Sequence, residues 1–194
     1  MQVRHAPFYQ EMNLMLSITF VNSFTDDEID ELWAMYDDVF RPLNRKSPCR
    51  QSFYEEEFRE AMSSPAFIKM GVYDNGELMS MAIWSRDLTR FPWLSRDFFE
   101  AEYPEHYRAG EITYVVALLT KPEAHARGYG SAGAKETVDE VMSHGGLMFI
   151  DVCDANGLLP TVAAEHYFGQ HANVELTKLG TQSYWRMRFT PLVA

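Results

Sequence analysis

The residues between 122 and 131 carry the clearest chemical pattern in the sequence. They read Pro-Glu-Ala-His-Ala-Arg-Gly-Tyr-Gly-Ser, and they separate an apolar stretch ending near Leu119 from a segment of helical character. Gly128 and Gly130 let a ligand approach the backbone closely. The first amides of a helix have no acceptor in a preceding turn, and the helix dipole adds partial positive charge there. The pattern predicts a loop whose backbone amides bind an anionic group such as a phosphate.

Two common nucleotide-binding motifs do not match this loop. Gly128-x-Gly130 lacks the third glycine of a dinucleotide fingerprint, and no Gly-Lys-Ser or Gly-Lys-Thr follows it as in a triphosphate-binding loop. The net charge of −11 does not prevent anion binding, because salt screens surface charges over about 8 Å whereas amides contact a phosphate directly. The loop therefore indicates a different phosphate-bearing ligand.

The composition narrows the class of protein. Asp and Glu number 28 against 17 Lys and Arg, so the surface repels DNA and RNA, and eight of the eleven surplus charges lie in residues 1–110. Cys49 and Cys153 lie far apart without Cys-x-x-Cys spacing, and the histidines lack zinc-ligand spacing. No stretch has the length of a signal peptide or a membrane span. We expect a cytoplasmic protein with no disulfide framework, metal, nucleic-acid partner or membrane partner.

A single domain is expected over residues 1–194, because no repeat or long linker interrupts the chain. Residues 1–13 form an N-terminal extension, and 14–21 alternate as a strand does. Residues 67–84 predict a hairpin whose turn contains Asn75-Gly76, since these residue types tolerate the positive φ of a tight turn.

Two helices are predicted between the first strand and this hairpin. Thr25 to Glu28 matches a capping box and starts a helix that Arg41-Pro42 should end. Ser52 to Glu55 matches a second capping box, and the helix that follows should end near Ser64-Pro65.

Residues 87–110 follow the hairpin without a regular period. Aromatic side chains such as Phe91, Trp93 and Phe99 alternate there with carboxylates. The length of this insertion exceeds that of an ordinary connection, which favours a lid or wall over a ligand. The segment is expected to be partly helical, and an extra aromatic helix packed against the sheet is the alternative.

The second half of the chain predicts a parallel βαβ unit. Residues 112–119 are nearly all apolar, as in a central strand buried on both faces, and 128–143 predict a helix. Residues 147–153 predict a second buried strand, parallel to the first. A short helix at 159–168 follows.

The last predicted elements are strands at 174–179 and 183–189, which form a terminal hairpin. The expected fold class is α/β, with a mixed, largely antiparallel sheet around a central parallel βαβ unit. The terminal strand either closes the sheet or pairs across a homodimer.

The glycine loop, with its flanks, resembles motif A of the GCN5-related N-acetyltransferase (GNAT) family, Gln/Arg-x-x-Gly-x-Gly/Ala. The chain reads His125-x-x-Gly128-x-Gly130, so histidine replaces the first residue of the motif. Arg127 is a common companion in this loop, and Pro122-Glu123 is typical after the fourth strand of the family. The predicted order of elements over residues 14–189 is also similar to that of the family, so the resemblance implies the GNAT acyl-CoA N-acyltransferase fold.

A second pattern is similar to the family's sequence after its fifth strand. Asn156 is followed by Ala163-Ala164 and Tyr167, although His171 and Ala172 stand where the family has Gly-Phe. The resemblance implies that Tyr167 protonates the departing CoA thiolate, a base comparable in strength to a phenolate. A tyrosine packed in the core is the alternative.

The resemblance further implies acetyl-CoA as co-substrate. Its pyrophosphate would bind the amides of the glycine loop, and its pantetheine arm would pair with the central strand. The implied binding residues are Leu118, Leu119, Thr120, His125, Ala126, Arg127, Gly128, Tyr129, Gly130, Ser131 and Asn156.

The acceptor amine must lose a proton, which calls for a carboxylate, a histidine or a water chain. Glu111, at the start of the central strand, is the first candidate base, and Asp151 on the neighbouring strand is the second. Either carboxylate is alternatively an ordinary solvated charge at a strand end. Cys153 is interpreted as packing rather than as a nucleophile.

The sequence thus favours an N-acetyltransferase that passes acetyl directly to a primary amine on a small cationic molecule. A protein N-terminus or lysine is the rival acceptor, and a longer acyl group is a further variant. A non-catalytic acyl-CoA-binding regulatory domain of the same fold is the alternative, because His125 and the missing Gly-Phe depart from the family.

Overall fold

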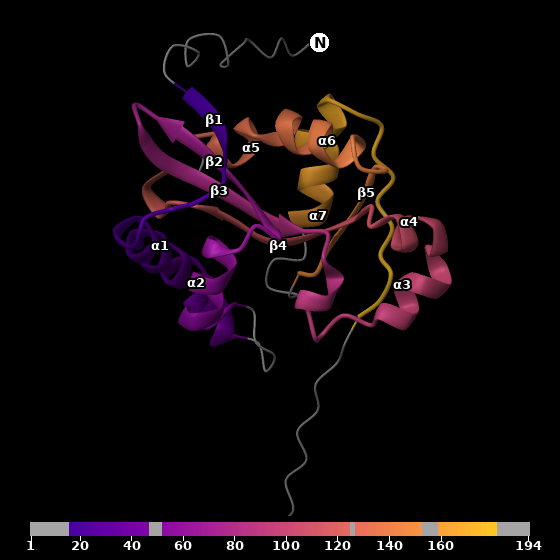
Figure 1. Ribbon diagram of the computed structural model, residues 1–194. Coiled ribbons are helices and arrows are strands. Elements are labelled where there is room, and N and C mark those ends of the chain that lie inside the picture. Colours follow the sequence, from indigo (N-terminus) through magenta and orange to yellow (C-terminus); the bar gives the residue numbers. More distant parts are fainter. Residues whose placement is uncertain (1–15, 47–51, 125–126, 153–158, 182–194) are drawn as a thin grey trace, which may run out of the picture.

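Five strands form one mixed sheet in the computed structural model, which describes residues 16–46, 52–124, 127–152 and 159–181 (Figure 1). They follow one another in chain order across the sheet, and neighbours are antiparallel except for the last pair, which is parallel. The expected α/β class with a largely antiparallel sheet and one parallel βαβ unit is confirmed. The strands are β1 (Leu16–Val21), β2 (Phe67–Asp74), β3 (Glu77–Ser85), β4 (Ile112–Thr120) and β5 (Leu147–Ile150).

Helices cover both faces of this sheet (Figure 1). α1 (Asp26–Asn44) and α2 (Glu55–Ser63) pack on one face, called here the α1 face, where Phe58 is fully buried in the main hydrophobic core. α5 (Tyr129–Ala132) and α6 (Ala134–Met142) lie on the opposite face, called the α6 face. None of the helices in the described part of the chain is long and apolar enough to cross a membrane.

Local signals set the start of α1 but not its end. The hydroxyl of Thr25 accepts a hydrogen bond from the amide of Glu28 (3.3 Å), and the Glu28 carboxylate accepts one from the amide of Thr25 (2.7 Å), which confirms the predicted capping box. The predicted end at Arg41-Pro42 is wrong, because the helix continues to Asn44. A proline near a helix end removes one backbone hydrogen bond without preventing the last residues from closing theirs.

α2 begins two residues later than its predicted capping box. Tyr54 is the residue before the helix, and its amide donates to the carboxylate of Glu57 at 2.9 Å. Ser52 instead accepts a hydrogen bond from the side-chain amide of Asn44 at 2.6 Å. A tertiary contact with the end of α1 therefore replaces the local cap. The helix ends at Ser63, as predicted.

The hairpin of β2 and β3 confirms its predicted turn, since Asn75 has a φ of 53° and Gly76 a φ of 82°.

The insertion at 87–110 is partly helical, as expected, and it packs against the sheet. Phe91 and Phe99 are buried in the core of the α1 face, and the ring of Phe99 meets that of Phe149 edge-on at 4.9 Å. This burial matches the interpretation of a packed aromatic segment. Its elements are η1 (Leu88–Arg90), α3 (Arg96–Glu102) and α4 (Pro104–Ala109).

The βαβ unit differs from its prediction in two details. The helix expected over 128–143 is divided at Gly133 into α5 and α6. β5 ends at Ile150 and is half-buried rather than buried, because it is the last strand of the described sheet. Its predicted extension includes Cys153, which lies outside the described residues.

The segment after β5 is helical at first and then irregular. The predicted helix at 159–168 is present as α7 (Leu159–Val162), a π-helical turn η4 (Ala163–Tyr167) and a 3-10 turn η5 (Phe168–Gln170). The strand predicted at 174–179 is wrong, because these residues form no ladder. Alternating side chains need a neighbouring strand to pair with, and the predicted partner at 183–189 lies outside the described residues.

A buried lysine joins α2 to the sheet. Lys69 on β2 is 2% exposed, and its ammonium group donates hydrogen bonds to the carbonyl oxygens of Met62 (3.2 Å) and Ser64 (3.0 Å). These are carbonyls at the C-terminal end of α2, where the helix dipole is negative. Burial nevertheless lowers the pKa of Lys69 below its ordinary value.

This pKa shift predicts a pH dependence of stability. The folded protein releases the Lys69 proton at a lower pH than the unfolded chain, so the free energy of unfolding should rise with pH between the two pKa values. In urea titrations from about pH 8 to pH 10, the wild type should therefore gain stability relative to Lys69→Met. Lys46→Met, which removes an exposed charge, serves as the control. Parallel pH profiles for the wild type and Lys69→Met would contradict the prediction.

Candidate active site

β4 and β5 diverge halfway along β4. Their pairing joins Ile112–Val115 to Leu147–Ile150 and ends there, whereas β4 continues to Thr120. The divergence coincides with an irregularity in the pairing of β4 with β3, which leaves Val116 without an opposite residue. Such a bulge bends and twists its strand. Within the described chain, no strand pairs with the β5 side of residues 116–120, so the backbone groups that point there are accessible to a ligand.

A cavity of about 220 Å³ lies beside this diverging part of β4, bounded by α5, α6 and η4. Ser80 on β3 fixes its strand wall, because its hydroxyl donates to the Leu119 carbonyl (2.8 Å) and lies 2.9 Å from the hydroxyl oxygen of Thr120. The cavity brings together five residues that the sequence predicted for the cofactor or the chemistry: Leu118, Leu119, Thr120, Gly130 and Tyr167.

The glycine loop is anchored to the sheet at the end of this cavity. Gly128 has a φ of 84°, a conformation that favours glycine, and α5 begins at the next residue. The side chain of Tyr129 is buried, and its hydroxyl donates to the carboxylate of Asp74 at 2.6 Å, which raises the pKa of Tyr129. Ser131 closes the turn by donating from its hydroxyl to the Gly128 carbonyl at 2.9 Å. The loop therefore holds the first amides of α5 in one orientation.

Gly133, where the helix is divided, lies close to the sheet. A Cβ atom at Gly133 would lie 2.5 Å from the terminal methyl of Met70 on β2, whereas a glycine lets the backbone approach the sheet. Gly130 faces the other wall, and a Cβ there would lie 3.1 Å from the hydroxyl oxygen of Thr120. Small residues at these positions keep the loop close to β4 and leave room for a ligand at the end of the strand.

Tyr167 ends the π-helical turn η4 and lines the cavity. π-Helical turns are rare and frequently occur at functional sites. The chain then bends so tightly that a Cβ at Gly169 would lie 2.6 Å from the carbonyl oxygen of Ala164. Tyr167 is half-buried at the cavity wall, so the structure does not place it inside the hydrophobic core.

The structure does not bring Glu111 to the cavity. Glu111 precedes β4, where its carboxylate lies 3.8 Å from the ring nitrogen Nδ1 of His106 and packs against Gly145. Leu118 is seven residues further along the strand, which corresponds to about 23 Å at the usual rise. Glu111 therefore lies at the opposite end of β4.

Asp151, the second candidate base, lies at the point where the strands diverge. It follows Ile150, whose partner on β4 is the last paired residue, Val115. The hydroxyl of Tyr114 donates to the carboxylate oxygen Oδ1 of Asp151, and the indole N–H of Trp93 donates to the same hydroxyl at 3.0 Å. Burial, with Asp151 beside it, raises the pKa of Tyr114 well above its ordinary value.

Sequence reasoning missed Tyr114 and Trp93 as site residues. Tyr114 was included in a buried strand, and Trp93 was one of several aromatic residues of the insertion. The available signal was the position of a polar-tipped aromatic in an otherwise aliphatic strand, because a buried tyrosine hydroxyl needs a partner.

The α1 face carries most of the surplus negative charge. α1 and α2 together contain eleven carboxylates and two arginines. Such a concentration of one sign of charge attracts cations and speeds their association. Tyr114 belongs to the core of this face, so its hydrogen bond to Asp151 is made from the α1 side of the sheet.

His125, Ala126 and Asn156, which the sequence also predicts for cofactor binding, lie outside the described residues.

Comparisons with solved structures identify the fold. The chain is similar to the ribosomal-protein-S18-alanine N-acetyltransferase of Escherichia coli, with 13% identity over 78% of this chain and 76% of that chain, at a TM-score of 0.50. It is also similar to aminoglycoside acetyltransferase meta-AAC0020 from an uncultured soil metagenomic sample, crystallised with sisomicin, with 10% identity over 91% of this chain and 100% of that chain, at a TM-score of 0.53. A third similar structure is a transcriptional regulator from Bacillus halodurans C-125, with 14% identity over 88% of this chain and 99% of that chain, at a TM-score of 0.53.

No protein-family model matches the chain, and no curated protein matches it. At 10–14% identity the structural likeness establishes the fold alone. The resemblance to GCN5-related N-acetyltransferases is therefore confirmed at the level of the fold.

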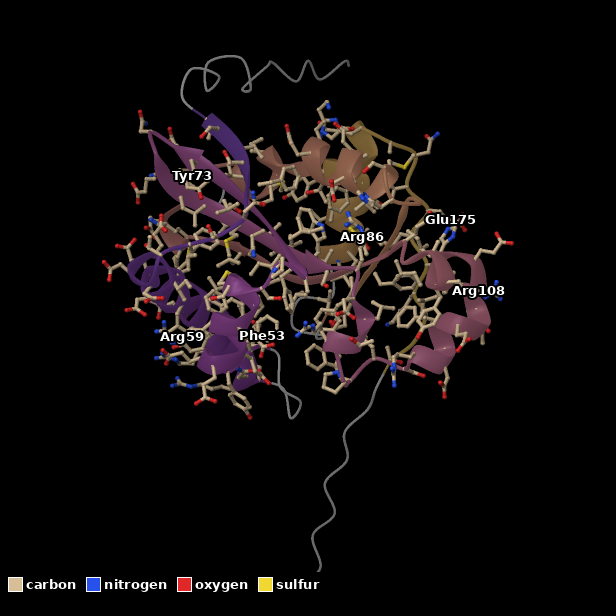
Figure 2. All side chains as sticks on the ribbon, in the orientation of Figure 1. Phe53, Arg59, Tyr73, Arg86, Arg108 and Glu175 are labelled. Carbon is tan, nitrogen blue, oxygen red and sulfur yellow. The ribbon has the colours of Figure 1, made fainter. Side chains whose placement is uncertain are left out.

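The anchor of the glycine loop gives a testable prediction. Tyr129→Phe removes the hydrogen bond to Asp74, so the amides of residues 128–132 should exchange with deuterium faster than in the wild type. Tyr73→Phe on β2 (Figure 2) is the matched control, because the Tyr73 hydroxyl makes no hydrogen bond to the described part of the chain. Equal exchange rates in Tyr129→Phe and the wild type would show that the loop does not depend on this contact.

Proposed function

We propose that the chain is an acetyl-CoA-dependent N-acetyltransferase that transfers acetyl by direct attack of a primary amine. The observation that carries the proposal is the cavity at the divergence of β4 and β5, which joins the strand wall at Leu118–Thr120 to Gly130 of the glycine loop and to Tyr167. The fold shared with N-acetyltransferases supports this interpretation, although a fold alone does not fix an activity.

The residues around the cavity fit the parts of acetyl-CoA. The amides of Gly128, Tyr129 and Gly130 are proposed to bind the pyrophosphate, since those of Arg127 and Ser131 already donate to the carbonyls of Ala124 (3.2 Å) and Gly128 (3.1 Å). Backbone groups of Leu118–Thr120 are proposed to pair with the amide groups of the pantetheine arm, because β4 has no strand partner on that side within the described chain. His125 and Asn156 complete the proposed site as sequence predictions.

The chemistry needs one proton acceptor and one proton donor. The amine nitrogen forms a bond to the thioester carbonyl carbon, and the carbon–sulfur bond then breaks. Tyr167, at the cavity wall, is proposed to give its hydroxyl proton to the CoA thiolate. Asp151 is proposed to receive the proton of the amine nitrogen. The nitrogen uses its lone pair to form the carbon–nitrogen bond, so its remaining proton becomes acidic and passes to the carboxylate. Glu111 is not retained for this role, because it lies at the other end of β4.

A small cationic molecule is the proposed acceptor. Eleven carboxylates on α1 and α2 favour the approach of a molecule with more than one positive charge, and exposed Trp93 offers an aromatic ring near Asp151. The similar structures include an enzyme named for aminoglycosides and one named for a ribosomal-protein alanine, so the fold itself does not choose between small-molecule and protein acceptors.

Binding of acetyl-CoA should stabilise the protein. At a hundredfold excess over the dissociation constant the gain is about 2.7 kcal/mol, which raises Tm by roughly 5–11 °C for a chain of this size. Gly128→Glu should abolish the rise by placing a negative charge in the anion-binding loop. Gly110→Glu is the matched control, because both glycines have positive φ and open space around them, so the backbone strain and added charge are the same. A Tm rise in Gly128→Glu equal to that of Gly110→Glu would contradict the proposed loop.

Turnover is tested by CoA thiol release across a panel of polyamines, aminoglycosides and peptides with free N-termini or lysines. We expect release with the polycationic small molecules, and Tyr167→Phe should lower kcat about 100-fold or more with little change in the KM for acetyl-CoA. Tyr107→Phe, on α4 beyond the far end of β4, should match the wild type. Binding of acetyl-CoA without thiol release from any amine would instead support a non-catalytic acyl-CoA-binding domain.

A further inference from the structure

The insertion at 87–110 reaches the site through one side chain. Trp93 leaves the insertion between η1 and α3, and its indole N–H donates to the hydroxyl oxygen of Tyr114 on β4 at 3.0 Å. The Tyr114 hydroxyl donates in turn to Oδ1 of Asp151. Three segments that are distant in the sequence thus meet in one chain of hydrogen bonds.

The direction of this chain is fixed by the available hydrogens. An indole N–H is a donor only, and a tyrosine hydroxyl has a single hydrogen. Because Trp93 occupies an acceptor site of the Tyr114 oxygen, the Tyr114 hydrogen points to the carboxylate. Asp151 therefore receives a hydrogen bond on one oxygen, and the structure gives its other oxygen no partner within the described residues.

Packing holds the middle of the chain in place. Tyr114 is 2% exposed, and its ring lies against that of Phe91 with 4.6 Å between centroids. The Phe91 ring also contacts Trp93 at 5.5 Å. Phe91 is itself buried in the core, so the insertion fixes both the ring and the hydroxyl of Tyr114.

Asp151, by contrast, is exposed at the end of β5, where the pairing with β4 stops. A solvated aspartate at a strand end normally samples several rotamers. The hydrogen bond from Tyr114 restricts it to the orientation that directs its second oxygen away from Tyr114.

We propose that Trp93 and Tyr114 are positioning residues that hold the Asp151 carboxylate in the orientation needed to receive the proton of the acceptor amine. This inference rests on the proposed acetyltransferase function. The proton moves from the amine nitrogen to the second oxygen of Asp151 while the nitrogen bonds to the acetyl carbon, and Asp151 then returns it to solvent. Tyr114 keeps its own proton throughout, and the insertion acts as a fixed support for the base.

The kinetic test compares single and double variants in the thiol-release assay. Tyr114→Phe and Trp93→Phe should lower kcat/KM for the amine about 10- to 100-fold and leave the KM for acetyl-CoA unchanged. Tyr114→Phe combined with Asp151→Asn should be no slower than Asp151→Asn alone, because the two residues act as one unit. Tyr103→Phe is the matched control, since Tyr103 belongs to the same insertion and contacts Phe149 through its ring. Additive losses in the double variant would overturn the proposal.

A spectroscopic test does not depend on turnover. The indole N–H resonance of Trp93 should shift in Asp151→Asn, because the change reaches it through the Tyr114 hydroxyl, and it should shift in Tyr114→Phe but not in Tyr103→Phe. An unchanged resonance in Asp151→Asn overturns the proposal whether or not the enzyme is active. If no amine is turned over but the resonance shifts, the proposed function fails and the hydrogen-bonded support of Asp151 stands.

Discussion

The divergence of β4 from β5 after Val115 is the constraint on which the rest of the site depends. If the two strands had stayed paired to Thr120, the amides and carbonyls between them would have satisfied one another and left no space at the end of the sheet. The bulge at Val116 bends β4 at this point, and Ser80 ties its last residues to β3. The cavity, the accessible backbone and the position of Asp151 all follow from this one change in pairing.

The two faces of the sheet provide different environments at the divergence. On the α6 face, glycines let α5 and α6 approach β2 and β4, and the contact between Tyr129 and Asp74 fixes the glycine loop. This face suits an extended anionic ligand held by amides. On the α1 face, the surface carries carboxylates and the core is aromatic. In the proposed reaction, the acyl donor would therefore bind on the α6 face, and the charge of the α1 face would attract a cationic acceptor.

Burial of polar groups on the α1 face is supported by specific partners. Lys69 would be costly to bury as a charge, but the end of α2 offers it two carbonyls. The hydroxyl of Tyr114 both accepts and donates a hydrogen bond, so it is satisfied although it is buried. Lys69 joins α2 to the strand that follows it, and Tyr114 joins the insertion and the end of β5 to β4, so both groups limit how these elements can move relative to the sheet.

Local patterns were sufficient for the elements whose signals act within a few residues. Thr25 and Glu28 capped α1, Asn75 and Gly76 formed the hairpin turn, and Gly128 began α5, because each depends on hydrogen bonds or φ angles of neighbouring residues. The order of elements was also sufficient to anticipate the fold. Tertiary contacts decided the start of α2, where Ser52 accepts a hydrogen bond from Asn44, and the close approach of Gly133 to Met70 on β2. They also place the two candidate bases differently: Glu111 and Asp151 both flank strands, and only the register of β4 with β5 puts Asp151 at the divergence and Glu111 at the far end. Register and packing depend on residues that are tens of positions apart, so no local pattern records them.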